Sequence, residues 1–367
     1  MKEYLKKQYI NARGKRSSKK ILIIESDDWG SIRIPNKKVQ EYLINEKLIQ
    51  PTDPFSAFDC LENADDYKIL FEVLKNHRDR FDNHPVLTTN IVMANPDFDK
   101  IKANQFEKFY FEPFAKTYEN YYPGCQTFET LKMGIDQQLI FPQFHAREHL
   151  NAIQWLKRLQ RDDERFLKAF DVNCFAINDL AEGNNRANLM ASYDYQNKEE
   201  FEYIKESIEQ GLKLFEQIFG FSSKTTIAPC YVWNDNIEEI FHKNGILSIQ
   251  SSYIQQFNKY GKHERIWQKM GKVNKLNQKY FIRNVLFEPA LNPKINWVEK
   301  ALESIAIAFF WGKPAIVGSH RINYVAGLSQ ENRDNSLEQL HELLKKVQKR
   351  WSDILFINSQ QLLELYS

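Results

Sequence analysis

The sequence lacks the features that mark disulfide-rich, membrane-spanning or strongly charged proteins. Its 367 residues include only four cysteines, with no CxxC pair, at positions 60, 125, 174 and 230. Such spacing favours reduced thiols over a disulfide framework, so we expect a cytoplasmic protein. No apolar run approaches the roughly 20 residues that cross a bilayer, and we therefore expect no membrane span.

Charge gives no indication of a nucleic-acid partner or of a membrane surface. The 50 Lys and Arg residues nearly balance the 48 Asp and Glu residues, which leaves a formal net charge of +2. Basic residues do gather in residues 1–18, but this stretch has no apolar core of the kind that a secretory signal needs. We interpret it as a solvated tail or a short leading helix, followed by a single domain over residues 19–367.

Short runs rich in Ile and Val alternate with segments of helical periodicity. The runs predict buried strands at residues 19–26, 86–94, 138–145, 175–178, 225–233, 246–252, 281–287, 314–320 and 354–359. Helical patterns are clearest at residues 150–160, 199–220, 236–245, 297–312 and 335–351. This alternation predicts parallel strands in an α/β architecture. Residues 45–82 and 97–136 are aromatic, charged and irregular, and we interpret them as insertions near these positions.

Unusual polar residues follow several of the predicted strands. Asp27 and Asp28 end the first strand, His145 and His149 end the third, and His320 ends a late one. Loops that leave the carboxyl ends of parallel strands converge on one face, so we expect these side chains to meet. Two histidines four residues apart, with a carboxylate from elsewhere, can form a three-ligand metal site that leaves one position open.

Four short motifs occur in the order found in one enzyme family. They are SDDWG (26–30), HAREH (145–149), APCY (228–231) and VGSH (317–320). In these motifs the chain resembles the polysaccharide deacetylases of the NodB-homology type, as a divergent member. The resemblance runs over residues 20–360, and it implies a distorted (β/α) barrel of about seven strands.

The resemblance also implies a role for each motif. Asp27 would be the catalytic base, and a divalent cation, expected to be zinc, would be held by Asp28, His145 and His149. The main-chain amide of Tyr231 would stabilise the oxyanion, and His320 would be the general acid. The implied reaction removes acetyl groups, by cleavage of a C–N amide bond, from N-acetylated sugars of a polysaccharide or its precursor. O-acetylated sugars are a second substrate class, and the expected partner is in either case a carbohydrate.

The chain departs from the family pattern at several positions. Ala228 stands where the family has an arginine that pairs with the base, so another cation must orient Asp27. The candidates are Arg33, Arg147, Arg283 and Arg321. Trp29 and Gly318 also differ from the family residues at their positions, and the fourth family motif has no match.

Two alternative functions remain open at this point. Residues 145–149 also satisfy the HxxEH pattern of inverzincin peptidases, in which Glu148 would be the base. That pattern needs a helix, whereas the FPQF stretch before His145 is typical of a strand and Pro142 disfavours a helix there. The second alternative is a metal-binding or glycan-binding relative that has lost catalysis, for which the missing arginine is the main support.

Other residues of these types carry weaker signals. Cys230 is interpreted as a small buried side chain, because no base is evident beside it. Glu288 and Asp235 follow strands and could line the cleft, although hydrogen bonding to the fold is the favoured interpretation. Five further histidines are expected to be surface or capping residues without partners: His77, His84, His242, His263 and His341.

Overall fold

Parallel strands form the centre of the protein. The computed structural model describes residues 2–177 and 189–366. Its main sheet has ten strands, in the order β10-β11-β7-β6-β5-β2-β1-β13-β12, with β14 beside β1. Every neighbouring pair is parallel except β10 and β11. Two small antiparallel pairs, β3 with β4 and β8 with β9, lie outside it.

The strands of the main sheet are β1 (Ile21–Trp29), β2 (Leu87–Val92), β5 (Ile140–Ala146), β6 (Thr225–Ile227), β7 (Ser248–Ser251), β10 (Lys272–Val273), β11 (Lys279–Ile282), β12 (Val285–Leu286), β13 (Ala315–His320) and β14 (Leu355–Phe356). The small pairs are β3 (Ala94–Pro96) with β4 (Phe111–Pro113), and β8 (Ile254–Lys259) with β9 (Lys262–Trp267). Seven strands of the main sheet have three or more residues, namely β1, β2, β5, β6, β7, β11 and β13. The prediction of an α/β fold with about seven parallel strands is therefore confirmed.

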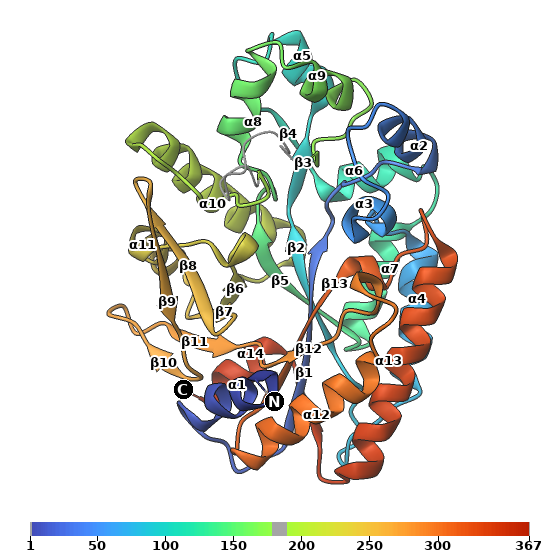
Figure 1. The fold of residues 1–367 in the computed structure, drawn as a ribbon, viewed down its shortest axis with the longest axis vertical. Helices are drawn as coiled ribbons and strands as arrows, with labels where there is room; N and C mark the ends of the chain where they lie inside the picture. Colours follow the sequence, from blue (N-terminus) through green and yellow to red (C-terminus); the bar gives the residue numbers. More distant parts are fainter. Residues whose placement is uncertain (1, 178–188, 367) are drawn as a thin grey trace.

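Helices cover the outside of the sheet (Figure 1). On one side α10 (Lys198–Phe219) and α11 (Asp235–Lys243) pack together, and on the other α4 (Ala64–Lys75), α7 (Thr127–Asp136), α12 (Trp297–Phe310) and α13 (Gln330–Arg350) do so. The shorter helices are α1 (Lys2–Ala12), α2 (Lys37–Asn45), α3 (Pro54–Phe58), α5 (Phe98–Ala103), α6 (Phe114–Tyr121), α8 (Ala152–Leu159), α9 (Glu164–Phe170) and α14 (Ser359–Leu365). The described residues also contain three 3-10 turns: η1 (Pro229–Tyr231), η2 (Pro289–Leu291) and η3 (Arg321–Asn323).

Two of the local predictions were wrong. Residues 175–177 form no strand, and residue 178 lies outside the described residues. Phe175 and Ile177 are buried in an apolar cluster with α8 and α9, so their hydrophobicity reflects packing rather than strand pairing. Residues 45–82 and 97–136, expected to be irregular, contain α3 and α4, and α5, α6 and α7. Helix α4 begins at a capping box in which Asn63 and Asp66 each bond the other's backbone.

The basic N-terminal segment forms a helix that packs on the fold. In α1, Lys7 pairs with Glu303 of α12 at 2.5 Å. Asn11 accepts a hydrogen bond from Asn284, and Gln8 accepts one from Trp311. Residues 2–12 of the basic segment thus form a short helix that contacts α12.

Successive side chains of β1 point alternately to the two faces of the sheet. Leu22 and Ile24 belong to the large cluster beneath the surrounding helices, whereas Ile21 and Ile23 pack in a second cluster with α14. Successive side chains of a strand point to opposite faces. The inner row that begins with Ile21 and Ile23 therefore continues to residues 25 and 27, which are both acidic.

A polar layer lies above the apolar cluster at α14. Gln143 of β5 donates hydrogen bonds to Asn90 of β2 at 2.6 Å and to Gln250 of β7 at 3.1 Å. Glu25 accepts a hydrogen bond from Ser359, the first residue of α14, at 2.6 Å. Hydrogen bonds of this kind offset the cost of burying polar side chains. This polar layer lies between the apolar cluster at α14 and the carboxyl ends of the strands, and its hydrogen bonds hold those ends in place.

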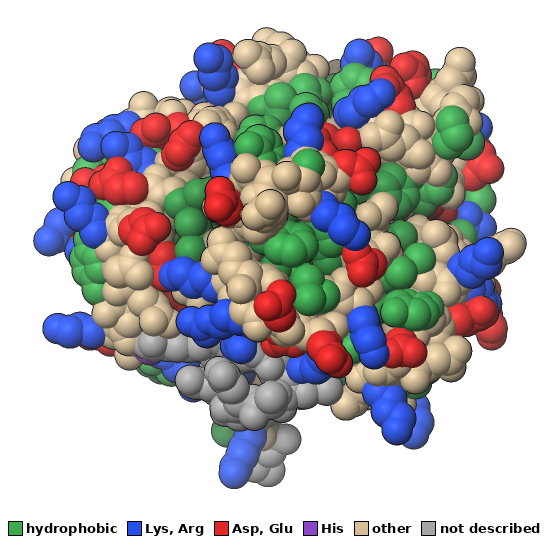
Figure 2. Space-filling model, turned by 90° about the horizontal axis from the view of Figure 1, so that it is seen from above, with side chains coloured by type: hydrophobic (Ala, Val, Ile, Leu, Met, Phe, Trp, Pro, Cys, Tyr) green, Lys and Arg blue, Asp and Glu red, His purple; other side chains and the backbone are tan. Residues whose placement is uncertain are grey.

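The outer surface carries no continuous region of one charge on the face seen from above. Figure 2 shows Lys and Arg side chains interspersed with Asp and Glu there, with apolar side chains between them. Within residues 2–177 and 189–366, no helix has both the length and the apolar character needed to cross a bilayer.

Candidate metal centre

The two neighbouring aspartates of β1 enter the same cavity because the strand is irregular between them. In a regular strand, Asp27 and Asp28 would point to opposite faces. The pairing of β1 with β2 shifts register between Ser26 and Trp29, and Asp28 has a φ of 75°. An extra residue of this kind redirects a side chain, and a left-handed backbone at a residue other than Gly costs about 1–3 kcal/mol. Because of this irregularity, the Asp28 side chain lies on the same face of the sheet as that of Asp27, and not on the opposite face, which the helices cover.

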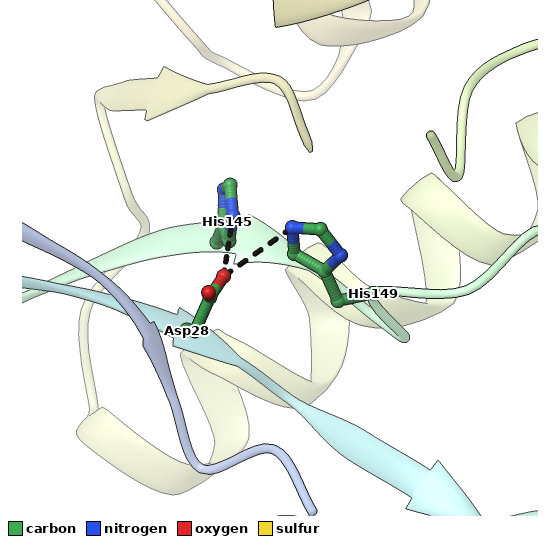
Figure 3. Close-up of side chains that lie close together, drawn as sticks. All are labelled: Asp28, His145 and His149. Atoms are coloured by element: carbon green, nitrogen blue, oxygen red, sulfur yellow. Dashed lines mark ion pairs between the residues drawn. The ribbon is translucent and has the colours of Figure 1, made fainter. Parts of the chain in front are cut away.

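Asp28, His145 and His149 form one buried group (Figure 3). The Nε2 atom of His145 lies 3.7 Å from Asp28 Oδ1, and that of His149 lies 3.3 Å from the same oxygen. His145 is the next-to-last residue of β5 and donates its Nδ1–H to the carbonyl of Ile227 at 2.8 Å, which leaves Nε2 facing Asp28. His149 follows on the loop before α8.

The chemistry of this group fits a divalent cation. Asp28 Oδ1 and His145 Nε2 are buried and have no hydrogen-bond partner among the described residues. Buried polar atoms without partners are costly, and a cation would satisfy both of them. Ligand atoms held at about 2.0–2.1 Å around a tetrahedral zinc ion lie roughly 3.3 Å apart, close to the 3.3 and 3.7 Å between Asp28 Oδ1 and the two histidines.

The protonation states also suit metal ligands. Burial lowers the pKa of His149 to about 4, although Asp28 and His145 act on it as well. Burial opposes the charge on Asp28, but His149 and His145 hold the pKa of that carboxyl well below its ordinary value. Near neutral pH, His149 is therefore a neutral imidazole and Asp28 is a carboxylate, the forms that bind a metal ion.

Arg283 takes the place of the arginine that the sequence lacks at position 228. Its NH1 donates to Asp27 Oδ2 at 2.6 Å and its NH2 to Asp27 Oδ1 at 2.7 Å. Its Nε donates to Glu25 at 2.6 Å. Burial disfavours the Asp27 charge, yet Arg283 outweighs it and the pKa of Asp27 falls to about 2.

The other three candidate arginines do not contact Asp27. Arg147 binds Glu148 and Tyr203, while Arg321 binds Asp59 and Glu62. Arg33 lines the cavity and has Asp59 as its ion-pair partner, at 3.8 Å. The structure therefore selects Arg283 among the four candidates.

His320 is held by Glu288, which the sequence analysis interpreted as a residue that hydrogen-bonds to the fold. Its Nδ1–H donates to Glu288 Oε1 at 2.5 Å, and its Nε2 lies 3.8 Å from Asp27 Oδ2. Burial disfavours the imidazolium, but Glu288 and Asp27 raise the pKa of His320 to about 10. Glu288 also accepts a hydrogen bond from Asn323. The only signal for Glu288 was its place after a strand, in LFEP.

The backbone at Tyr231 differs from what the resemblance implies. The Tyr231 N–H already donates to the carbonyl of Ala228 at 3.0 Å, so it is not free to bind an oxyanion in this conformation. Cys230 and Tyr231 both have left-handed backbones, with φ of 54° and 56°. Two such residues in a row, neither of them Gly, store strain of about 1–3 kcal/mol each. The expected role of the Tyr231 amide therefore requires this turn to rearrange.

One cavity of about 270 Å³ joins the six residues to which the resemblance assigns roles. They are Asp27, Asp28, His145, His149, Tyr231 and His320. Arg33, Asp53, Phe55 and Cys230 line the same cavity. Cys230, interpreted from the sequence as a small buried side chain, is only half-buried.

The HxxEH alternative does not fit the structure. His145 lies at the end of β5 and residues 147–150 form no helix, so the two histidines do not lie on one helix face. The Glu148 carboxylate does not face the group of Asp28, His145 and His149. It accepts hydrogen bonds from Arg147, Tyr203 and Ser207 instead. A general base needs access to the attacking water, and Glu148 has none.

The expectation that the remaining histidines lack partners is wrong for His77, His84 and His341. His77 is not without partners, because its Nε2 lies 3.0 Å from His341 Nδ1 and its Nδ1 lies 2.6 Å from Gln348. His84 is also bonded, to the carbonyl of His77. Asp235, by contrast, follows its interpretation as a residue bonded to the fold, since it pairs with Lys259 at 2.8 Å.

Comparison with known proteins gives likenesses of fold only. No family model and no curated protein matches the sequence. A solved 4-alpha-glucanotransferase from Thermococcus litoralis has 10% identity and a TM-score of 0.48 over 94% of this chain. This chain spans 40% of the length of that enzyme.

Two further solved structures match over most of their own length. One is a protein from Pseudomonas aeruginosa PAO1 assigned as a polysaccharide deacetylase, with 8% identity and a TM-score of 0.47. The other is the allantoinase PuuE, with 10% identity and a TM-score of 0.46. In both cases the match covers 94% of this chain and 90% of the other. Membership of the deacetylase family stays a prediction.

Proposed function

We propose that this chain is a metal-dependent hydrolase that removes acetyl groups from N-acetylated sugars of a polysaccharide or its precursor. The observation that carries the proposal is the placing of Asp27 and His320 beside the Asp28, His145 and His149 group, in one cavity. A zinc ion held there would supply a Lewis acid that polarises the carbonyl of the substrate. O-acetylated sugars remain a second class to be tested.

Asp27 is suited to accept a proton from the attacking water. Its Oδ1 accepts hydrogen bonds from Asn90 and from Arg283, whereas its Oδ2 accepts one, from Arg283. The remaining acceptor site is therefore on Oδ2, the oxygen that faces His320. A pKa of about 2 keeps Asp27 ionised near neutral pH, so its carboxylate can accept a hydrogen bond from the water and take the proton as the C–O bond forms.

His320 is suited to give a proton to the departing amine. Its Nδ1–H is bound by Glu288, so the Nε2–H is the proton that faces the cavity. The raised pKa keeps the imidazolium charged at neutral pH, as a general acid requires. Water and the amide would thus become acetate and a free amine, with one proton taken by Asp27 and one given by His320.

The proposal is tested by zinc analysis together with acetate release from N-acetylated glycans. Asp27→Asn and His320→Ala should each lower kcat by at least 100-fold while the zinc content stays that of the wild type. Glu239→Gln, an exposed carboxylate on α11, serves as the control and should leave both quantities unchanged. Full activity in the first two variants would rule out the assigned roles.

The alternative of a non-catalytic binding relative loses its main support. That interpretation rested on the missing arginine at position 228, and Arg283 now supplies the guanidinium beside Asp27. A zinc-loaded protein that binds N-acetylated sugars but releases no acetate would restore it.

A further inference from the structure

Arg33 presents a guanidinium group to the metal cavity. It lies on the chain just after β1 and lines the cavity together with Phe55. The guanidinium carbon of Arg33 lies 4.5 Å from the centre of the Phe55 ring, and that ring packs nearly perpendicular to the His320 ring, with the ring centres 5.3 Å apart. Phe55 therefore fixes the position of Arg33 and separates its charge from the imidazolium of His320.

The hydrogen-bonding capacity of Arg33 is largely unused. In the described parts of the chain, its guanidinium group donates no hydrogen bond, and its side chain is 15% exposed. Its ion-pair partner is Asp59 at 3.8 Å, which is too long for a hydrogen bond. Asp59 is already bound by Arg321 at 2.8 Å through its other oxygen. An arginine carries five N–H donors, so a partly buried one without acceptors is poised to bind a ligand.

The other charged groups of the cavity are engaged elsewhere. Asp27 is neutralised by Arg283, and Asp28 faces the two histidines. Asp53 lines the cavity but uses its Oδ2 to accept hydrogen bonds from the backbone and hydroxyl of Ser56 at 3.0 and 2.7 Å. Asp53 forms no ion pair with Arg33 within the described residues. The N–H donors of Arg33 are therefore available to a ligand, while its charge also acts on Asp59 at 3.8 Å.

We propose that Arg33 recognises an anionic group, a carboxylate or a phosphate, on the substrate. This inference rests on the proposed function, and it narrows the substrate to an N-acylated compound that carries a negative charge close to its acetamido group. A cavity of about 270 Å³ lies near the lower limit of ligand pockets, so the charge must belong to the sugar unit in the cavity or to its direct substituent. The planar fork of arginine matches both anions in a bidentate manner.

The test compares binding of matched neutral and anionic sugars. The zinc-loaded Asp27→Asn protein, which should not turn over, is titrated with N-acetylglucosamine, N-acetylglucosamine 6-phosphate and N-acetylmuramic acid. At least one anionic sugar should bind roughly 10-fold or more tightly than the neutral one. Arg33→Gln in the same background should remove that advantage, about 10- to 100-fold, and leave the affinity for the neutral sugar unchanged. The anionic sugar whose affinity falls more in Arg33→Gln identifies the recognised group as phosphate or carboxylate.

Two further variants separate recognition from a structural role. Arg33→Lys keeps the charge without the fork and should recover part of the lost affinity. Arg80→Gln is the matched control, because Arg80 also stacks on a phenylalanine, Phe81, but lies before β2, at the opposite end of the sheet. Arg80→Gln should leave the affinities for all three sugars unchanged.

The inference is overturned if the neutral sugar binds as tightly as both anionic sugars, or if none of the three binds. It is equally overturned if Arg33→Gln weakens all three alike, or leaves the anionic sugars unaffected because they bind the zinc ion alone. Acetate release by the wild-type protein is measured separately. No acetate from any sugar, with an Arg33-dependent preference for anions, would refute the proposed function and leave this inference standing.

Discussion

Arg283 donates hydrogen bonds to both carboxylate oxygens of Asp27, at 2.6 and 2.7 Å, although the two residues are 256 positions apart in the chain. The pair is buried, and Glu25 and Ser359 continue the network toward α14. A guanidinium group thus reaches the expected base from β11 and its following turn, rather than from the APCY motif. This relationship decides how the candidate base is charged and oriented.

Removing the Arg283 charge should raise the pKa of Asp27. In Arg283→Met, the acid limb of the pH profile of kcat/KM for acetate release should move upward by a unit or more, because burial alone disfavours the carboxylate. The variant should also lose about 3–5 kcal/mol of unfolding free energy, since two buried carboxylates lose their partner. The acid limb of the pH profile should shift less in Arg283→Lys than in Arg283→Met. An unchanged acid limb in Arg283→Met would show that Arg283 does not set the ionisation of Asp27.

Metal binding should depend on Asp28 but not on its neighbour. Asp28→Asn should lower the zinc content, measured by mass spectrometry, from about one ion per chain to nearly none. Chelation should lower the melting temperature of the wild type, because a ligand at 100 times its Kd contributes about 2.7 kcal/mol, and should leave Asp28→Asn unaffected. Asp27→Asn is the matched control and should keep its zinc. Equal zinc in both variants would exclude Asp28 as a ligand.

The stability of the metal-free protein should fall at alkaline pH through His320. Its pKa is about 10 in the folded protein against an ordinary value of 6.5, so its contribution is complete below pH 6.5 and is lost as the pH rises through about 10. Asp27 acts in the opposite direction: its contribution is complete above pH 3.8 and is lost as the pH falls through about 2.

Melting temperatures measured from pH 6 to pH 10 check the contribution of His320. Glu288→Gln removes the main partner of His320, so the alkaline loss of stability should become smaller than in the wild type. Glu239→Gln, on the surface, should follow the wild-type curve. Identical curves for Glu288→Gln and the wild type would mean that Glu288 does not stabilise the imidazolium.

Glu148 should prove structural. Glu148→Gln should retain zinc and acetate release, because its carboxylate binds Arg147, Tyr203 and Ser207 rather than the metal group. It should lower the unfolding free energy by about 1–3 kcal/mol, since Arg147 loses a buried partner. Chemical denaturation and acetate assays measure the two effects. A 100-fold loss of activity with unchanged stability would instead favour a role for Glu148 as base.

Packing of α10 against β5 should limit what position 211 can hold. A Cβ added at Gly211 would lie 2.8 Å from Phe144 and 2.9 Å from Arg147, the residues on either side of the His145 segment. Gly211→Ala should therefore destabilise the protein by about 1–3 kcal/mol. In open helical space the same change would stabilise by about 0.5–1 kcal/mol. Lys213→Ala, exposed on the same helix, is the control for this denaturation measurement.

The sequence by itself determined the architecture and the grouping of Asp28, His145 and His149, because both depend on local sequence patterns. Hydrophobic runs and helical periodicity placed most of the strands and helices, and the order of the motifs selected Asp28, His145 and His149. Parallel strands bring their carboxyl ends to one face, so the meeting of these three residues followed from their positions at strand ends. Where a run was apolar for packing alone, as at Phe175 and Ile177, this reasoning failed.

Only the tertiary structure decided which charges meet. Four arginines were equal candidates in the sequence, and the order of strands in the sheet brought Arg283, and not the others, to Asp27. The same order brought Glu288 to His320, and the left-handed backbone of Asp28 turned its side chain inward. Contacts between residues hundreds of positions apart depend on strand order and register. Local periodicity determines neither, which is why the grouping of Asp28, His145 and His149 could be predicted from the sequence and the partners of Asp27 and His320 could not.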